Sequence, residues 1–275
     1  QIAHSAQGLG LVHEAWHLTF AARHVGVSRS LKAGEYEVQQ GQTVEQILSQ
    51  LAEGKTYLRR ISVPEGYSIL ELEQLLLNSF GLDTSNFSLP PEGSVLPETY
   101  FYSRGETADA VIGRMKQSMI KTLAELWEAR PETTELHNMD EVLILASIVE
   151  KETAVPDERA KVAAVFLNSL KRNMRLQSDP TVIYGITGGL PLGRAITRSD
   201  LREETPFNTY RIKGLPPTPI ANPGKASIEA VLSPADVPFL YFVANGKGGH
   251  AFARTLSEHN RNVREWRKNK QPATD

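Results

Sequence analysis

Cysteine is absent from this sequence, which excludes a thiol nucleophile and a metal site built from thiolates. Long apolar runs are also missing, because no stretch approaches the roughly 18 apolar residues that mark a membrane-spanning helix. The N-terminus lacks the basic and apolar regions of a signal peptide. The charges are balanced, with 30 basic and 32 acidic side chains and a net charge of −2. Neither nucleic acid nor an anionic membrane surface is therefore favoured as the principal partner.

The chain does contain enough apolar side chains for a core, since 40% of its 275 residues are hydrophobic. This length is typical of one large domain or of two unequal ones. A shift to Asp, Ser, Asn and Pro between Gly81 and Gly93 indicates a loop or a domain junction. We predict an α+β fold with a small N-terminal module, residues 1–85, and a larger mixed domain, residues 86–275.

The segment from Val142 to Thr153 predicts an apolar helix that ends in two carboxylates. Asn138 occupies the expected N-cap position, and Glu141 follows it at the capping-box spacing. Helical periodicity places Glu152 on the apolar stripe and Glu150 on a face of smaller residues that water reaches more easily. Three apolar residues share the face of Glu152: Leu145, Ile148 and Val149.

A carboxyl held among apolar groups has a raised pKa, because burial favours its neutral form. A general acid that works near neutral pH needs this property. The alternative is that both glutamates simply end a buried helix in water, which is a common arrangement.

The N-terminal residues Leu11 to Arg23 predict an amphipathic helix that contains the sequence H-E-A-W-H. His13 and His17 match the H-E-x-x-H spacing that binds zinc in metalloproteases, with the intervening glutamate as base. No third ligand follows at the spacing of the metzincins. The alternative is three solvated histidines, with His24 as the third.

A strand, a turn at Gly41 and a helix that begins after Thr43 are predicted between Ala33 and Leu51. This pattern resembles the LysM module, a small glycan-binding unit, through its Y-x-V-x-x-G-x-T motif. The alternative is an ordinary strand, turn and helix that act only as a spacer.

Apolar periodicity and helix-breaking residues predict most of the remaining elements. Strands are expected around residues 57–63 and 238–243, and a hairpin loop at residues 246–250. Helices are expected near residues 68–80, 107–130, 156–172 and 256–268.

Two further segments gather polar and aromatic side chains. Residues 92–102 place a carboxylate and three aromatic rings around one proline, a combination that commonly holds sugar rings. The alternative is an irregular core strand with Tyr100 and Phe101 on opposite faces. Residues 177–185 carry more amide, carboxylate and phenol groups than a turn needs. The glycine- and proline-rich residues 185–224 have little periodicity, which is typical of a functional surface.

A set of short motifs is spread over nearly the whole chain: GEYEVQQGQTV from Gly34, LPETY from Leu96, SIVEKET from Ser147, VFLNSL from Val165, LQSDPTVIYG from Leu176, NTY from Asn208, GLPP from Gly214, ANPG from Ala221 and YFVANGKGGH from Tyr241. Through these motifs the sequence resembles the YceG-like family, the endolytic murein transglycosylases. One position departs from the family pattern, which usually has N-R-L where this chain has Asn168, Ser169 and Leu170.

The resemblance implies cleavage of the β-1,4 bond between N-acetylmuramic acid and N-acetylglucosamine in peptidoglycan, which leaves a 1,6-anhydro end. One glutamate acts first as general acid and then as base, so neither a cofactor nor a metal is implied. We assign this role to Glu152, with Glu150 as the second candidate. The expected substrate-binding residues are Glu98, Tyr100, Gln177, Asp179, Tyr184, Asn208, Tyr210 and Asn222.

The resemblance also implies partners and a location. Glycan strands are the expected partner, and peptidoglycan synthases and division proteins are further candidates. The family has one N-terminal membrane helix that this sequence lacks, so we expect a soluble portion of a single-pass protein with its catalytic domain outside the cytoplasm. Two alternatives stay open: a non-catalytic peptidoglycan-binding protein and a zinc hydrolase that uses His13 and His17.

Overall fold

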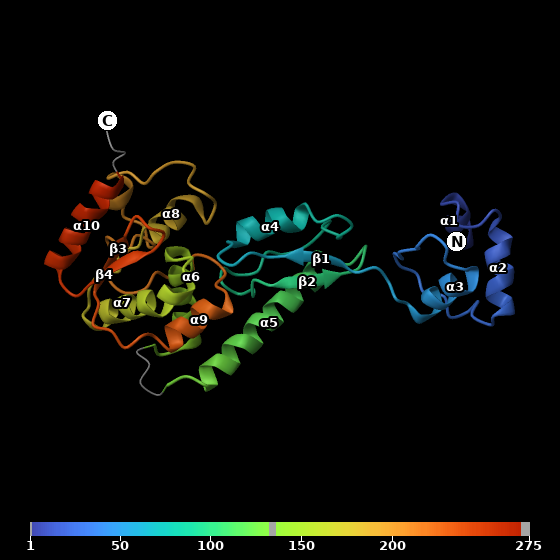
Figure 1. Cartoon of the computed structure of the whole chain (residues 1–275), viewed down its shortest axis with the longest axis horizontal. Coiled ribbons are helices and arrows are strands. Elements are labelled where there is room, and N and C mark those ends of the chain that lie inside the picture. Colours follow the sequence, from blue (N-terminus) through green and yellow to red (C-terminus); the bar gives the residue numbers. More distant parts are fainter. Residues whose placement is uncertain (1, 132–135, 271–275) are drawn as a thin grey trace.

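The computed structural model describes residues 2–131 and 136–270, and these form an elongated molecule with three parts (Figure 1). Helices α1 to α3 lie at one end, a small sheet with two helices forms the middle, and the remaining elements gather at the other end (Figure 1). The combination of helices with two separate two-stranded sheets is an α+β fold, as the sequence predicts.

The N-terminal part contains α1 (Ile2–Gly8), α2 (Ala15–His24) and α3 (Val44–Glu53). Helix α3 begins with the predicted cap, since the Thr43 hydroxyl accepts a hydrogen bond from the backbone N–H of Gln46. The predicted strand before Gly41 is not formed, because residues 35–39 pair with no strand in the described chain. The Glu35 carbonyl accepts one backbone hydrogen bond across to this segment, from the N–H of Tyr57. A LysM-like module is therefore not confirmed.

The middle part is built on strands β1 (Arg59–Ser62) and β2 (Thr99–Tyr102), which pair antiparallel with Ile61 opposite Tyr100. Helices α4 (Ile69–Leu77) and α5 (Ala108–Glu128) accompany this sheet (Figure 1). The predicted strand and both predicted helices are confirmed within a few residues. Tyr100 is buried and Phe101 is 56% exposed, so their side chains lie on opposite faces of β2.

The C-terminal part contains the largest apolar cluster, which surrounds α6 (Met139–Glu152). Its other elements are η1 (Pro156–Glu158), α7 (Arg159–Lys171), α8 (Asp179–Thr187), η2 (Asp200–Arg202), α9 (Lys225–Leu232), β3 (Tyr241–Ala244), β4 (His250–Ala253) and α10 (Leu256–Lys270). Helix α6 packs against α7, α8 and α9. Strands β3 and β4 form an antiparallel hairpin, as the sequence predicts.

Helix α6 begins where its sequence indicates. The Asn138 side chain accepts a hydrogen bond of 2.9 Å from the backbone N–H of Glu141. The Glu141 carboxylate accepts a bond of 2.8 Å from the N–H of His137, one residue earlier than a capping box requires. Residues 144–149 are all buried, so the middle of α6 is enclosed on every face.

Polar contacts join the middle part to the C-terminal part around Asn222, which is fully buried. Its side-chain amide donates to the Tyr67 carbonyl at 2.8 Å, and its side-chain oxygen accepts from the N–H of Val95 at 3.3 Å. Lys151 at the end of α6 donates to the Gly66 carbonyl at 3.1 Å. The last turn of α6 is therefore fixed to both parts of the molecule.

No helix within the described ranges is both long enough and apolar enough to cross a membrane. The N-terminal helix also differs from the sequence prediction. Glu14 has an extended backbone, with φ of −135°, and α2 begins only at Ala15. His13 therefore lies outside the helix that carries His17, and the predicted continuous helix from Leu11 is wrong at its start.

Candidate active site

A cavity of about 390 Å³ reaches Glu152, the last residue of α6. Four of the residues predicted for the site line it: Glu152, Gln177, Asp179 and Tyr210. The rest of the lining comes from α7, the loop after it, the β3 hairpin and α10: Val165, Phe166, Ser169, Met174, Arg175, Leu176, Leu240, Tyr241, Phe242, Val243 and His259. The cavity thus combines two carboxyl groups with an apolar and aromatic wall.

Glu152 has the environment of a general acid. Burial raises the pKa of its carboxyl to about 7, and the nearby charge of Asp179 adds to the increase. The Ser178 hydroxyl donates a hydrogen bond of 2.5 Å to Glu152 Oε1, which lowers the pKa and limits the shift. Near neutral pH this carboxyl therefore exists in both forms, and it can donate a proton and take one back.

Ser178 is held in place by buried threonines. Its N–H donates to Thr209 Oγ1 at 2.9 Å. Thr181 Oγ1 donates to the Ser178 carbonyl at 2.7 Å and lies 2.8 Å from Thr209 Oγ1. Ser178, Thr181 and Thr209 are all at most 1% exposed, so the group that orients Glu152 is itself rigidly positioned.

Asp179 and Tyr210 form a hydrogen-bonded pair on the same cavity. The Tyr210 hydroxyl donates to Asp179 Oδ1 at 2.6 Å. Burial, together with this carboxylate, raises the pKa of Tyr210 far above its ordinary value, so the phenol keeps its proton. Gln177 lies beside them with a left-handed backbone, φ of 54°, and its N–H donates to the Thr209 carbonyl.

Glu150 has a different environment, although it is only two residues from Glu152. Its Oε2 accepts a hydrogen bond of 2.9 Å from the N–H of Gly224, the N-cap residue of α9. Its Oε1 lies 3.5 Å from a guanidinium nitrogen of Arg159, and the side chain is 6% exposed. Glu150 therefore fixes α6 to α9 and α7, and it does not line the cavity.

Comparison with known proteins shows the family of this chain. The model of the YceG-like family matches residues 1–265. The chain belongs to the YceG-like family. A relative from Bacillus subtilis (strain 168), named endolytic murein transglycosylase, is 30% identical over 88% of this chain and 74% of its own length.

Two further YceG-like proteins show the extent of the similarity. An endolytic murein transglycosylase from Streptococcus pneumoniae serotype 2 is 28% identical over 96% of this chain, which spans 56% of that relative's length. A crystal structure of a YceG-like protein from Listeria monocytogenes aligns with a TM-score of 0.62 and 30% identity, over 94% of both chains. The fold described above is therefore shared with a solved YceG-like structure.

In this YceG-like chain, position 169 lies on the cavity. Ser169 on α7 lines it and is 4% exposed. The cavity therefore has a small hydroxyl at the position where the sequence departs from the expected N-R-L motif.

The other predicted binding residues do not line the cavity. The Tyr100 hydroxyl donates to the Leu96 carbonyl at 2.7 Å, inside the middle part. Asn208 donates to the Glu203 carbonyl at 2.6 Å and shapes a loop, while Asn222 joins the middle and C-terminal parts. Glu98 is exposed beside β2.

Tyr184 contacts a second buried carboxyl, Glu92. Its hydroxyl donates to Glu92 Oε2 at 3.3 Å, and Glu92 also accepts from the N–H of Ile69 at 3.1 Å and from the Asn222 amide at 3.3 Å. Burial raises the pKa of the Glu92 carboxyl to about 7. The pKa of Tyr184 rises to about 12, because the phenol is itself partly buried and lies beside the charge of Glu92. The Glu92 carboxyl accepts from the first backbone N–H of α4, and it does not line the Glu152 cavity.

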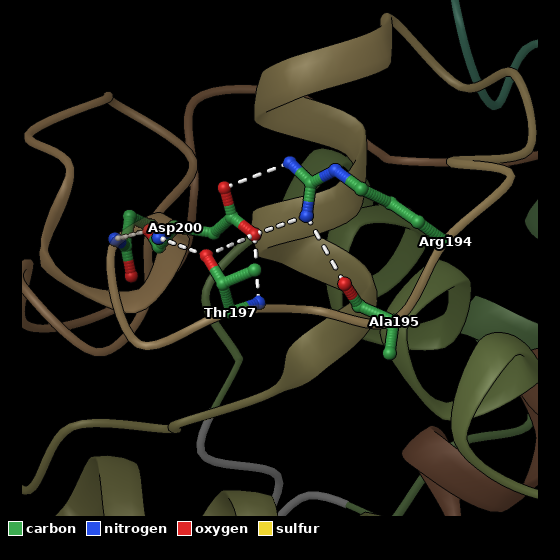
Figure 2. A network of polar contacts seen from close by, with 5 residues as sticks. Arg194, Ala195, Thr197 and Asp200 are labelled. Atoms are coloured by element: carbon green, nitrogen blue, oxygen red, sulfur yellow. Dashed lines mark hydrogen bonds and ion pairs between the residues drawn. The ribbon is translucent and has the colours of Figure 1, made fainter.

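An ion-pair network organises the loop that supplies Thr209 and Tyr210 (Figure 2). Arg194 donates to both oxygens of Asp200, at 2.6 and 3.0 Å, and the N–H and hydroxyl of Thr197 donate to Asp200 Oδ2. These donors hold the pKa of Asp200 well below its ordinary value. The Asn208 amide then donates to the Asp200 carbonyl at 3.3 Å, which links the network to the site.

The zinc alternative finds no structural support in the N-terminal part. His13 precedes α2 while His17 lies within it, so the two do not share the helical face that H-E-x-x-H needs. Across residues 2–131 and 136–270, no cluster of three or more His, Asp or Glu side chains could hold a metal.

Sequence reasoning selected Glu152, Gln177, Asp179 and Tyr210, and it missed Ser178, Arg175, Tyr241 and His259. Ser178 lies inside the segment that stood out for its polar density, so its neighbours were the available signal. Tyr241 and His259 come from β3 and α10, and their rings are tilted by 31° with centroids 5.3 Å apart. Only the fold brings these two residues to α6.

Proposed function

We propose that this chain is a lytic transglycosylase that cleaves the β-1,4 bond between N-acetylmuramic acid and N-acetylglucosamine within peptidoglycan strands. The observation that carries the proposal is the Glu152 carboxyl, which lies in a cavity and has a pKa of about 7. The names of the curated relatives, endolytic murein transglycosylase, support the reaction class.

In the proposed reaction, protonated Glu152 gives its proton to the glycosidic oxygen as the bond from that oxygen to C1 of the muramic acid breaks. The C6 hydroxyl of the same sugar attacks C1 and closes the 1,6-anhydro ring. Its proton passes to the Glu152 carboxylate, which restores the acid. The intramolecular nucleophile needs no external water, and its proximity supplies much of the rate.

The environment of Asp179 favours this single-acid mechanism over hydrolysis. A retaining or inverting glycosidase needs a second free carboxylate to act on the anomeric carbon or on water. Asp179 is the second carboxyl of the cavity, and it accepts a hydrogen bond from the Tyr210 hydroxyl. We assign Asp179, Tyr210 and Gln177 to substrate binding and to stabilisation of the positive charge that develops on the sugar ring.

The aromatic part of the cavity lining suits a sugar ring. Phe166 and Phe242 pack edge to face with centroids 5.7 Å apart, and Tyr241 lies beside them on β3. The apolar face of a sugar ring packs on such aromatic surfaces, while its hydroxyls meet polar side chains. We propose that this wall orients the glycan strand across Glu152.

The proposed substrate also implies a cellular context. Peptidoglycan strands lie outside the cytoplasmic membrane, so we propose that the catalytic part works there and that one N-terminal membrane helix anchors the full-length protein. Peptidoglycan synthases and division proteins are proposed neighbours. We further propose residues 86–275 as the catalytic domain, since all of the cavity lining lies within them.

The test is digestion of purified peptidoglycan by the parent chain, by Glu152→Gln and by Glu150→Gln, with the products identified by mass spectrometry. We expect internal cleavage with 1,6-anhydro ends from the parent, and a loss of about a thousandfold for Glu152→Gln, the scale of general acid catalysis. Glu150→Gln keeps 1,6-anhydro products, with a loss of stability as its main effect. Binding without any product from the parent would instead indicate a non-catalytic peptidoglycan-binding protein.

A further inference from the structure

Arg175 is the only lysine or arginine among the described residues that line the Glu152 cavity. It lies in the loop between α7 and α8, three residues before Ser178. The other charged or titratable side chains of the lining are two carboxyls, a tyrosine pair and a histidine: Glu152, Asp179, Tyr210, Tyr241 and His259. Burial lowers the pKa of His259, so Arg175 supplies the positive charge of this cavity near neutral pH.

The guanidinium of Arg175 has no acidic partner within residues 2–131 and 136–270. Other arginines of the chain do pair with carboxylates: Arg59, Arg114, Arg159, Arg194 and Arg211. An exposed arginine on a cavity that contains carboxyl groups, yet paired with none of them, keeps its donors available for a ligand.

The backbone that carries Arg175 is fixed on both sides. Asn173 and Gln177 have left-handed backbones, with φ of 53° and 54°, which few residues other than glycine adopt. The N–H of Met174 donates to the Ser169 carbonyl at 2.9 Å, and the N–H of Gln177 donates to the Thr209 carbonyl at 3.2 Å. The loop is therefore anchored to α7 and to the Thr209 segment, and it presents Arg175 at a defined position.

We propose that Arg175 binds a carboxylate on the lactyl branch of the muramic acid next to the cleaved bond. This inference rests on the proposed function. The sugar hydroxyls and acetamido groups of a glycan strand carry no charge, so a guanidinium gains most from the branch. The forked guanidinium donates two parallel hydrogen bonds to a carboxylate, which fixes orientation as well as charge.

The carboxylate has two chemical sources. A muramic acid without a peptide stem has a free lactyl carboxylate, whereas one with a stem has that group in an amide bond and carries carboxylates further along the stem. Three substrates separate these sources: stem-bearing strands, strands from which an amidase has removed the stems, and stem-bearing strands whose carboxylates have been converted to amides.

The experiment compares the full chain with Arg175→Gln and Arg175→Lys on all three substrates. Arg172→Gln is the matched control, because Arg172 is an exposed arginine of the same loop that does not line the cavity. We expect Arg175→Gln to raise KM by about 10- to 100-fold on carboxylate-bearing strands, the range for a charged hydrogen bond, and to change little on amidated strands. Arg175→Lys should retain part of the binding, since it keeps the charge without the fork.

A KM effect confined to stem-bearing strands assigns the stem carboxylate, and an effect confined to stem-free strands assigns the lactyl carboxylate. Equal KM values for Arg175→Gln and Arg172→Gln on every substrate would overturn the proposal, as would an equal loss on amidated strands.

Binding separates this inference from the proposed reaction. Sedimentation of Glu152→Gln with insoluble strands, with and without Arg175→Gln, reports on the carboxylate contact even where no bond is cleaved. Weaker sedimentation of the double variant supports the role of Arg175 whatever the reaction, and unchanged sedimentation contradicts it. Failure of the parent to cleave any strand would contradict the proposed function alone.

Discussion

At the scale of single residues, Glu150 and Glu152 show how one helix end gives two glutamates opposite properties. Glu150 accepts a hydrogen bond from the N–H of Gly224 and lies 3.5 Å from a guanidinium nitrogen of Arg159. Burial and the charge of Asp179 disfavour ionisation of the Glu152 carboxyl, whereas the hydrogen bond from the Ser178 hydroxyl favours it. Two carboxyls whose environments differ in this way are a common basis for assigning an acid in an active site.

The pKa of Glu152 predicts how activity depends on pH. The general acid must be protonated, so kcat/KM should fall as the pH rises above about 7. Glutamine at position 152 cannot titrate, so any residual activity of Glu152→Gln should lack this fall in kcat/KM at alkaline pH. A parent whose kcat/KM stays constant between about pH 6 and pH 9 would contradict the assignment.

Ser178→Ala should shift the pH at which kcat/KM falls and should also lower kcat. The Ser178 hydroxyl stabilises the ionised carboxylate, so its removal raises the pKa of Glu152 and shifts this fall to higher pH. Loss of one orienting hydrogen bond should also reduce kcat about tenfold. Ser257→Ala is the control, because Ser257 is an exposed hydroxyl of α10. Identical pH profiles for Ser178→Ala and the parent would refute the role of Ser178.

At the scale of elements, helices with clear capping residues and apolar stripes could be predicted, and α8 and α9 could not. The capping residues and apolar stripes of α4, α5 and α6 gave their positions within a few residues. Helices α8 and α9 have only nine and eight residues and lie among glycine- and proline-rich segments. Helices of this length depend on tertiary packing, here against α6, which sequence periodicity does not report.

The predicted strand before Gly41 failed for a related reason. Its alternating residues suit a strand, yet a strand needs a partner, and in the described chain residues 35–39 have none. Alternation alone therefore indicated an extended backbone and not a sheet.

The Asp200 network predicts a local effect on the loop that supplies Tyr210. Because the folded-state pKa of Asp200 lies below its ordinary value, its contribution to stability is present above that ordinary value and is lost as the pH falls. Asp200→Asn should therefore speed amide hydrogen exchange at Asn208, Arg211 and Ile212 near neutral pH, while α4 stays protected. Asp157→Asn, a change at an exposed aspartate, should leave these amides unchanged. Equal exchange in the two variants would show that the network does not hold the loop.

At the scale of the whole molecule, polar residues that resemble a binding site in sequence also serve to join parts of the fold. The resemblance implied Asn222, Tyr184 and Tyr100 as substrate-binding residues. In the structure they contact Tyr67, Glu92 and the Leu96 carbonyl and line no part of the cavity. A buried polar residue that links distant segments cannot be separated from a binding residue by composition or spacing.

Glu92 gives this junction a predicted pH dependence. Its pKa is about 7 in the folded protein against an ordinary 4.5, so the folded state binds the proton more tightly. Stability should therefore fall as the pH rises from about 4.5 to about 7 and then stay level with respect to this group. Glutamine at position 92 is neutral at every pH. The melting temperature of Glu92→Gln minus that of the parent should therefore be larger at about pH 8 than at about pH 5.

The control for Glu92→Gln is built into the comparison. Glu152 has the same sign of pH dependence, but it is present in both proteins and its effect cancels in the difference between their melting temperatures. A difference in melting temperature that does not change with pH would mean that the Glu92 carboxyl does not have a raised pKa in the folded protein.

The most direct test of the central claim is digestion of peptidoglycan in water enriched in heavy oxygen, followed by mass spectrometry of the new muramic acid ends. Attack by the C6 hydroxyl, with Glu152 as the only acid and base, takes no oxygen from water, so the account predicts anhydro ends without heavy oxygen. Reducing ends that carry heavy oxygen would show that water is the nucleophile. The chain would then be a hydrolase, and Asp179 would need to act as a second catalytic carboxylate.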